Sequence, residues 1–468
     1  MSDDIASNNK IINEMNYLKS IALATLMLLL PATSAMAEVV FAFNGLKYTV
    51  TGENTVKVGK IGDSKKPSGK LVIPAQVTFD GTTYDVIAID SWGFFDCTMI
   101  TEVVLPPTVS NIDIWAFARC ESIKQLTIPA TVTRIGYAAF ENCTSLTSIE
   151  LPVTLKSVSE RLFNDCYKLS QVILPPTVTR IESLAFSDCK SLKKITLPDS
   201  LKVIGNSTFA YCDSLTDIVF PKGLERIGDD AFKGCYGLKS IMFPESLQSL
   251  GQDAFRNCKN LETVYITGGT KMDRGNPFPS CDKLKDLKTA GSENSPVLVD
   301  GVLFSHDMTE LISFRPDHPV TSYTVPASVK IIASHAFSGN KTLRAIKMTN
   351  VEHIGLAAFY GCSALAEVDF GKRLESIGKE AFNDCRSLTE IYLPDSMKEI
   401  GQIPFNFCYG LTKVSVSEAI ADDKQSFNNT TFRFSGDKMI FTIRKSDGTT
   451  RTIYYNDLYD ISRDYIFR

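Results

Sequence analysis

Apolar and polar positions recur along most of this chain in a unit of 23 residues. In residues 135–152 the unit begins with Ile-Gly, continues through Ala-Phe-x-x-Cys and ends in Leu-x-x-Ile-x-Leu-Pro. A Phe lies three residues before each of the 12 cysteines, and a further copy has Phe337 followed by Asn340. The cysteines are Cys97, Cys120, Cys143, Cys166, Cys189, Cys212, Cys235, Cys258, Cys281, Cys362, Cys385 and Cys408. A fixed period of this size predicts a repeat solenoid.

Each unit contains two short segments with the apolar pattern of strands. The first, as in Val172 and Leu174, ends in the two-residue alternation typical of a strand with one buried face. A proline such as Pro175 usually follows and ends the strand, because it has no N–H to donate. A second apolar pair, such as Val178 and Ile181, predicts the opposite wall of the coil. One coil cannot cover its own apolar side, so we expect the coils to stack into a β-rich solenoid.

The turn between these strands carries a recurrent Phe, and often a glycine. Burial of each ring contributes about 1.5–3 kcal/mol, so the Phe column is expected to fill the core and not to form a cofactor site. Glycines such as Gly136 and Gly205 are expected to allow the bend into the Ala-Phe turn.

The cysteines are predicted to be buried, reduced thiols. One Cys at the same point of every coil gives parallel side chains about 4.8 Å apart, the spacing of neighbouring strands. A disulfide requires Cβ atoms about 3.8 Å apart that point toward one another. Disulfides remain the alternative, because an exported protein could oxidise its cysteines. No Cys-x-x-Cys occurs in the chain, which argues against a zinc or dithiol redox site.

The repeat resembles the BspA-like class of leucine-rich repeats, which occur on exported bacterial surface proteins. The resemblance rests on the Ala-Phe-x-x-Cys-x-x-Leu-x-x-Ile-x-Leu-Pro pattern, as in residues 185–198, and covers about residues 40–416. It implies a leucine-rich-repeat solenoid that takes part in adhesion or ligand binding at a cell surface. It supplies no catalytic motif, no cofactor and no fixed binding residues.

The N-terminus has the pattern of a secretory signal peptide, predicted to span residues 1–37. Lys19 precedes an apolar run at residues 21–30, and Ala35-x-Ala37 is a small-residue cleavage site. The first residues are polar and unlike a signal, so Met15 is an alternative start. The apolar run is too short to span a bilayer as a helix, so no transmembrane segment is expected after signal removal.

The rest of the chain divides where the period is interrupted. The chain begins with strand patterns that lack the period, and the repeats follow. An interruption with the pattern of a β-hairpin separates these repeats from a second set, and the composition changes after that set. The predicted divisions are an N-terminal β cap (38–85), a first repeat block (86–284), a β-hairpin insertion (285–325), a second repeat block (326–416), and a linker with a small C-terminal β unit (417–468).

Charge and motifs exclude several functions. The formal net charge is −4 and both signs are interspersed, which does not favour nucleic acid or an anionic membrane. The chain lacks phosphate-binding glycine loops, His-Glu-x-x-His and Gly-x-Ser-x-Gly. Of the four histidines, His306 and His318 share the predicted insertion and are interpreted as solvated loop residues rather than metal ligands. We therefore predict a protein that is not an enzyme and has no metal or cofactor.

The remaining candidate for function is a surface. The residue between Ile and Leu of each first strand should point outward, and down the stack these residues form a row that we expect on a concave face. Most are ordinary β-formers, which a solvated sheet requires in any case. Val219, Met242 and Tyr265 are larger apolar residues on three adjacent coils, and Tyr392 lies at the same position in the second block. Exposed patches of this kind mark partner sites.

The sequence thus predicts an exported, non-enzymatic protein that binds an extracellular or cell-surface protein or glycan. A cell-surface adhesin is the first hypothesis. An envelope scaffold or glycan-binding accessory protein of the bacterium itself is the alternative, with a secreted, surface or periplasmic location. Partner binding is assigned to Val219, Met242, Tyr265 and Tyr392.

Overall fold

The computed structural model describes residues 39–60, 62, 66–272, 275–291, 295–417, 439–445 and 447–455. The segment predicted as a signal peptide lies outside these residues, as do most of the linker and the end of the C-terminal unit. Within the described part, every regular element is a β-strand.

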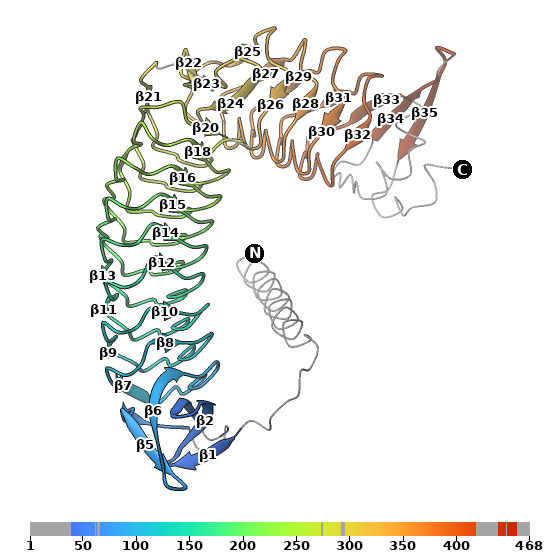
Figure 1. The fold of residues 1–468 in the computed structure, drawn as a ribbon. Coiled ribbons are helices and arrows are strands. Elements are labelled where there is room, and N and C mark those ends of the chain that lie inside the picture. Colours follow the sequence, from blue (N-terminus) through green and yellow to red (C-terminus); the bar gives the residue numbers. More distant parts are fainter. Residues whose placement is uncertain are drawn as a thin grey trace.

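The chain is a β-solenoid of stacked coils that bends between two straight blocks (Figure 1). Strands of neighbouring coils pair in parallel and one period apart, as Ile149 does with Val172 and Arg180 with Val203. The fold class expected from the repeat is therefore confirmed.

Two rows of strands form the walls of the solenoid. The outer strand row follows the left and upper side of the bend in Figure 1 and comprises β4 (Gly69–Val72), β7 (Ile100–Val104), β9 (Gln125–Thr127), β11 (Ser148–Glu150), β13 (Gln171–Ile173), β17 (Ser240–Met242), β19 (Thr263–Ile266), β21 (Asp286–Thr289), β25 (Ser322–Thr324), β27 (Ala345–Lys347), β29 (Glu367–Asp369), β31 (Glu390–Tyr392) and β33 (Lys413–Ser417). The second strand row comprises β6 (Thr82–Ile89), β8 (Asn111–Ile112), β10 (Arg134–Ile135), β12 (Ser157–Val158), β14 (Arg180–Ile181), β15 (Val203–Ile204), β16 (Arg226–Ile227), β18 (Ser249–Leu250), β20 (Lys271–Met272), β24 (Glu310–Phe314), β26 (Ile331–Ile332), β28 (His353–Ile354), β30 (Ser376–Ile377) and β32 (Glu399–Ile400). The Ala-Phe-x-x-Cys turns lie along a third side, the turn edge.

The N-terminal strands lie against the first coils. An antiparallel unit comprises β1 (Val40–Phe43), β2 (Leu46–Gly52) and β3 (Thr55–Lys60), and β5 (Gln76–Phe79) forms a hairpin with β6. The strand β6 then pairs with β8 and β4 pairs with β7, so this region supplies a neighbour to each wall of the first coils. It covers the apolar end that a solenoid would otherwise expose.

Gly136 and Gly205 on the turn edge are required by close packing rather than by a bend. A Cβ on Gly136 would lie 2.7 Å from the backbone nitrogen of Ile114, and one on Gly205 would lie 2.6 Å from that of Ser183. Neither glycine has the left-handed backbone that favours this residue. The left-handed residues of a coil are others, for example Ala138 at φ 51° and Asn142 at φ 58°.

The Phe residues form a stacked column inside the solenoid. In the first block, ring centroids from Phe94 to Phe278 lie 5.0 to 5.8 Å apart, and Phe186 has a ring on each side at 5.6 and 5.5 Å. All rings of this column are at most 2% exposed. The column is therefore core.

The segment between the blocks contains a coil that the sequence did not reveal. Strands β22 (Val297–Val299), β23 (Val302–Phe304) and β24 form an antiparallel unit, and β24 also pairs in parallel with β26. Phe314 stacks on Phe337 at 4.7 Å and so begins the column of the second block. Much of the expected insertion thus belongs to the array, although its Ala-Phe-x-x-Cys signature is missing.

The two blocks are joined along the turn edge. The backbone N–H of Asn276 donates to the carbonyl of Ser334 at 2.9 Å, and its side chain donates to the carbonyl of His335 at 3.1 Å. Near this junction the apolar residues of the solenoid divide into two separate large clusters. The bend in Figure 1 lies at this junction, where the regular period is interrupted.

The described C-terminal strands extend the outer strand row. Strand β34 (Met439–Arg444) pairs in parallel with β33, and β35 (Thr450–Tyr455) pairs with β34 in an antiparallel hairpin. This hairpin places Arg444 beside the last coils of the second block.

All 12 cysteines are buried free thiols in the structure. From Cys120 onward each Sγ lies 3.0 to 3.4 Å from the carbonyl oxygen of a Phe one coil earlier, as Cys189 does with Phe163 at 3.3 Å. Burial raises the pKa of the Cys143 and Cys189 thiols well above their ordinary value. Each thiol is thus a weak donor that links adjacent coils as well as a small apolar group.

We expect a thiol reagent to modify almost none of these cysteines in the native protein, because the reactive thiolate is disfavoured and the sulfur is inaccessible. After denaturation without reductant, nearly all 12 should react. Mass spectrometry of the alkylated protein checks both numbers. Several cysteines that react only after reduction would contradict this prediction.

Candidate ligand-binding surface

The structure places Val219, Met242 and Tyr265 on adjacent coils of the outer strand row. Val219 is 71% exposed and Met242 65% exposed, whereas Tyr265 is partly buried. Met242 lies opposite Tyr265 in the pairing of β17 with β19, and Lys288 lies opposite Tyr265 on the other side. Val219 precedes Phe220, whose ring stacks on Phe243 at 5.8 Å, one coil further along. The three residues therefore form a contiguous strip, called here the apolar strip.

The apolar strip does not face the inside of the bend. Figure 1 shows the outer strand row on the outer side of the bend, where β7 to β13 lie on the left and β25 to β31 along the upper arm. The expected concave position is therefore wrong. Each block by itself is nearly straight, and the bend is imposed at the junction, which the repeat pattern does not encode.

Tyr392 is not part of this strip. Lys347 and Asp369 precede it in the same row of the second block, where they pair across β27 and β29. The Tyr392 side chain is 57% exposed, and the guanidinium carbon of Arg444 lies 3.9 Å from its ring centroid. Sequence reasoning missed Arg444, because no periodicity connects the C-terminal hairpin with the repeats.

A shallow groove of about 650 Å³ lies over this part of the outer strand row. Its floor is formed by β27, β29, β31 and β33, and β34 contributes Thr442 at one end. The charged side chains that line it are Lys347, Glu367, Asp369, Glu390 and Lys413. The groove therefore combines one exposed aromatic ring with a mixed set of hydrogen-bonding groups.

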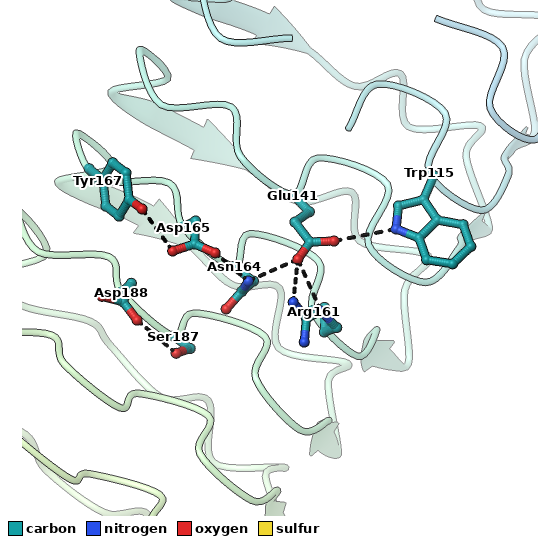
Figure 2. A network of polar contacts seen from close by, with 8 residues as sticks. All are labelled: Trp115, Glu141, Arg161, Asn164, Asp165, Tyr167, Ser187 and Asp188. Atoms are coloured by element: carbon teal, nitrogen blue, oxygen red, sulfur yellow. Dashed lines mark hydrogen bonds and ion pairs between the residues drawn. The ribbon is translucent and has the colours of Figure 1, made fainter. Parts of the chain in front are cut away.

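A polar network occupies the turn edge of the first block (Figure 2). Glu141 is 9% exposed and accepts hydrogen bonds from Trp115 Nε1 at 3.3 Å, Asn164 Nδ2 at 2.9 Å and Arg161, whose Nε and Nη2 lie at 3.0 and 2.5 Å. Asn164 continues the network to Asp165, which also accepts from the Tyr167 hydroxyl at 3.0 Å. One carboxylate thus ties three consecutive coils together.

Burial raises the pKa of several carboxyl groups of this edge, among them Asp165 and Asp188. Burial raises the pKa of Asp165, and hydrogen bonding from Tyr167 opposes this effect. Burial, followed by the negative charge of Asp165, raises the pKa of Asp188 to about 6. The charge of this surface therefore changes in weakly acidic solution. Burial and the neighbouring side chains explain the raised pKa of both groups, so the network is interpreted as structural rather than catalytic.

An aromatic cluster lies at the N-terminal end of the turn edge, and sequence reasoning missed it. Trp92 and Trp115 pack at 4.2 Å between centroids, with Phe95 4.7 Å from Trp92 and Tyr137 5.1 Å from Trp115. The sequence does contain an indication of this cluster, since the two tryptophans of the chain are one period apart. Trp115 is 5% exposed, so the cluster packs mainly against itself and seals the first coils.

The histidines differ from expectation at one position. His306 is exposed, but His318 is buried, with Nε2 2.8 Å from the carbonyl oxygen of Asp300 and its ring 4.5 Å from Phe314. His318 is therefore a structural residue and not a solvated one. His335 is also buried, 3.5 Å from Asp253, and burial lowers its pKa to about 4. Among the described residues, no three side chains of metal-binding type converge on one point.

A family model for the BspA type leucine rich repeat region matches the chain in 6 copies, over residues 87–216, 202–295 and 312–434. The chain belongs to the BspA-type leucine-rich repeat family. The third match begins at residue 312, consistent with the coil that contains Phe314. No relative was found among curated protein sequences.

Solved structures of leucine-rich-repeat proteins resemble this BspA-type chain. A leucine rich cell surface protein from Faecalibacterium prausnitzii is 25% identical, with 88% of this chain and 96% of that chain covered and a TM-score of 0.55. A leucine-rich repeat protein from Bacteroides ovatus is 26% identical, with 85% and 100% covered and a TM-score of 0.48. The first shows that the repeat architecture is shared over most of the chain. In the described part of the chain, no helix has the length and apolar character needed to cross a membrane.

Proposed function

We propose that this BspA-type protein is exported and binds a macromolecular partner at a cell surface through the apolar strip of Val219, Met242 and Tyr265. The observation that carries the proposal is the exposure of Val219 and Met242, at 71% and 65%, on coils next to Tyr265. The proposed role is non-enzymatic, and the first hypothesis is an adhesin.

The strip has the composition of an interaction site. Exposed Val and Met side chains beside a partly exposed Tyr are unfavourable in water, and the free energy falls when a partner covers them. Asp217, Ser240 and Thr263 stand two residues before the strip residues and supply a polar rim. A methionine side chain can adapt its shape to a partner, and tyrosine is frequent among residues that dominate binding energy.

Export is supported by the signal-like pattern of residues 1–37 and by the relative described as a cell surface protein. An envelope scaffold or glycan-binding accessory protein, on the bacterium's own side, is the alternative. Protease treatment of intact cells separates the two hypotheses. An adhesin should be cleaved, whereas a scaffold beneath the surface should be protected.

With a partner recovered by affinity purification, we expect Tyr265→Ala to weaken binding by about 1–2 kcal/mol, because the change removes a central aromatic contact. Titration calorimetry measures the Kd. The thermal midpoint should change little, since Tyr265 points outward from its strand and is only partly buried.

Tyr360→Ala is the matched control, because this tyrosine is 42% exposed and lies on the turn edge. Phe304 in the hairpin is unsuitable, since it is 1% exposed and its removal would disturb the core. If Tyr360→Ala weakens binding and Tyr265→Ala does not, the partner binds on the turn edge and the assignment to the apolar strip fails.

A further inference from the structure

The groove over the second block contains an aromatic ring that is held in place before any ligand binds. Arg444 covers Tyr392, and its own position is set by three acceptors. Its Nη1 donates to Ser415 Oγ at 2.6 Å, and its Nη2 donates to Asp395 Oδ1 at 2.9 Å and to the carbonyl of Leu393. The guanidinium carbon then lies 3.9 Å from the Tyr392 ring centroid.

The rest of the Tyr392 side chain is open. It is 57% exposed and lines the groove of about 650 Å³. A ring with one face fixed by Arg444 loses little conformational entropy when a ligand stacks on the other face. Tyr392 is thus a preorganised stacking surface rather than a mobile exposed side chain.

The remaining lining is polar and nearly balanced in charge. Glu367, Asp369 and Glu390 provide three carboxylates, and Lys347 and Lys413 provide two ammonium groups, so the formal charge of the lining is −1. Lys413 lies 3.7 Å from Glu390 and offsets one of the carboxylates. A polyanion would meet a lining of net negative charge, and a polycation would find an excess of only one carboxylate beside two ammonium groups.

An apolar peptide side chain finds no pocket in the groove. Of the branched aliphatic residues of its floor, Ile346, Ile391 and Val414 are at most 3% exposed and belong to the core, and Val368 is partly buried against it. The groove also lies over the face of the strands, whereas an extended peptide adds to a sheet at its edge. What the surface offers is one flat ring among hydroxyl, carboxylate and ammonium groups.

We propose that this groove binds a neutral oligosaccharide. A pyranose ring presents an apolar face of C–H groups that can stack on Tyr392, and its hydroxyl groups can donate to Glu367 and Asp369 and accept from Lys347. This site lies in the second block and is independent of the apolar strip. The two proposals can therefore fail separately.

The test is calorimetric titration of the full exported chain with neutral hexaoses built from glucose, mannose, galactose, xylose or N-acetylglucosamine. At least one hexaose should bind with a Kd of about 10 μM to 1 mM, the range open to a shallow polar site. Tyr392→Ala should weaken that binding about 10-fold or more, and Tyr392→Phe should preserve most of it. Asp369→Asn, which keeps the shape of the side chain, should also weaken it.

Tyr409→Ala is the matched control, because Tyr409 is 49% exposed and does not line the groove. Tyr265→Ala should leave hexaose binding unchanged, which distinguishes this site from the apolar strip. The proposal is overturned if no hexaose binds, or if binding survives both Tyr392→Ala and Asp369→Asn. A preference for sulfated or sialylated oligosaccharides over the neutral ones would also overturn it.

Discussion

Phe186→Ala is expected to lower the free energy of unfolding by about 3–5 kcal/mol, the usual cost of a large cavity in a core. Phe186 is fully buried and stacks on Phe163 at 5.6 Å and on Phe209 at 5.5 Å. Neighbouring coils on both sides limit how far the cavity can collapse. Urea denaturation followed by circular dichroism measures the change.

Phe94→Ala provides the comparison at the end of the column. Phe94 is equally buried but stacks on only one column ring, Phe117, at 5.2 Å. An end coil can fray without separating the remaining units, so this loss should be smaller. Equal losses at the two positions would show that the array does not behave as a stack of near-neighbour units.

Glu141→Ala is expected to lower the free energy of unfolding by about 2–4 kcal/mol. Removal of the carboxylate leaves Arg161, Asn164 and Trp115 without their shared acceptor, and loss of one partner from a buried ion pair costs about 3–5 kcal/mol. The expected loss is somewhat smaller, because the Arg161 side chain is 25% exposed and can recover hydration. Chemical denaturation of the variant and the parent checks the value.

Glu262→Ala is the matched control for this charge removal. Glu262 pairs with Lys285 at 3.4 Å, but both side chains are largely exposed. The control should therefore leave stability nearly unchanged, as exposed ion pairs contribute little. If both variants lose the same amount, the network of Figure 2 does not bind the coils together as its geometry indicates.

Much of the fold could be predicted because the same pattern of buried residues occurs in many successive coils. A Phe and a Cys at the same position in successive coils allow only a stacked arrangement that buries both. The alternation around Met242 likewise determined that its side chain points outward, and the structure has it 65% exposed. These inferences depend on local geometry repeated along the chain.

Prediction was weaker where contacts join distant segments. The coil of Phe314 lacks the turn signature, so the period alone does not reveal it, although its ring stacks on Phe337. The groove and its fixed ring depend on Arg444, 52 residues after Tyr392 and outside the period. The need for glycine at position 136 comes from the close approach of the neighbouring coil at Ile114 and not from a bend within its own coil, so only the stacked structure shows it.

Periodicity in the sequence was enough to predict the solenoid, its period and most of the residues that its coils bury. These properties follow from periodicity, which acts within a coil and between identical neighbours. The tertiary structure alone decided the bend between the blocks, the shared carboxylate of Glu141 and the pairing of Arg444 with Tyr392. Each of these arises where the repeat is broken or where unlike side chains meet, and there the free energy depends on particular contacts that no period encodes.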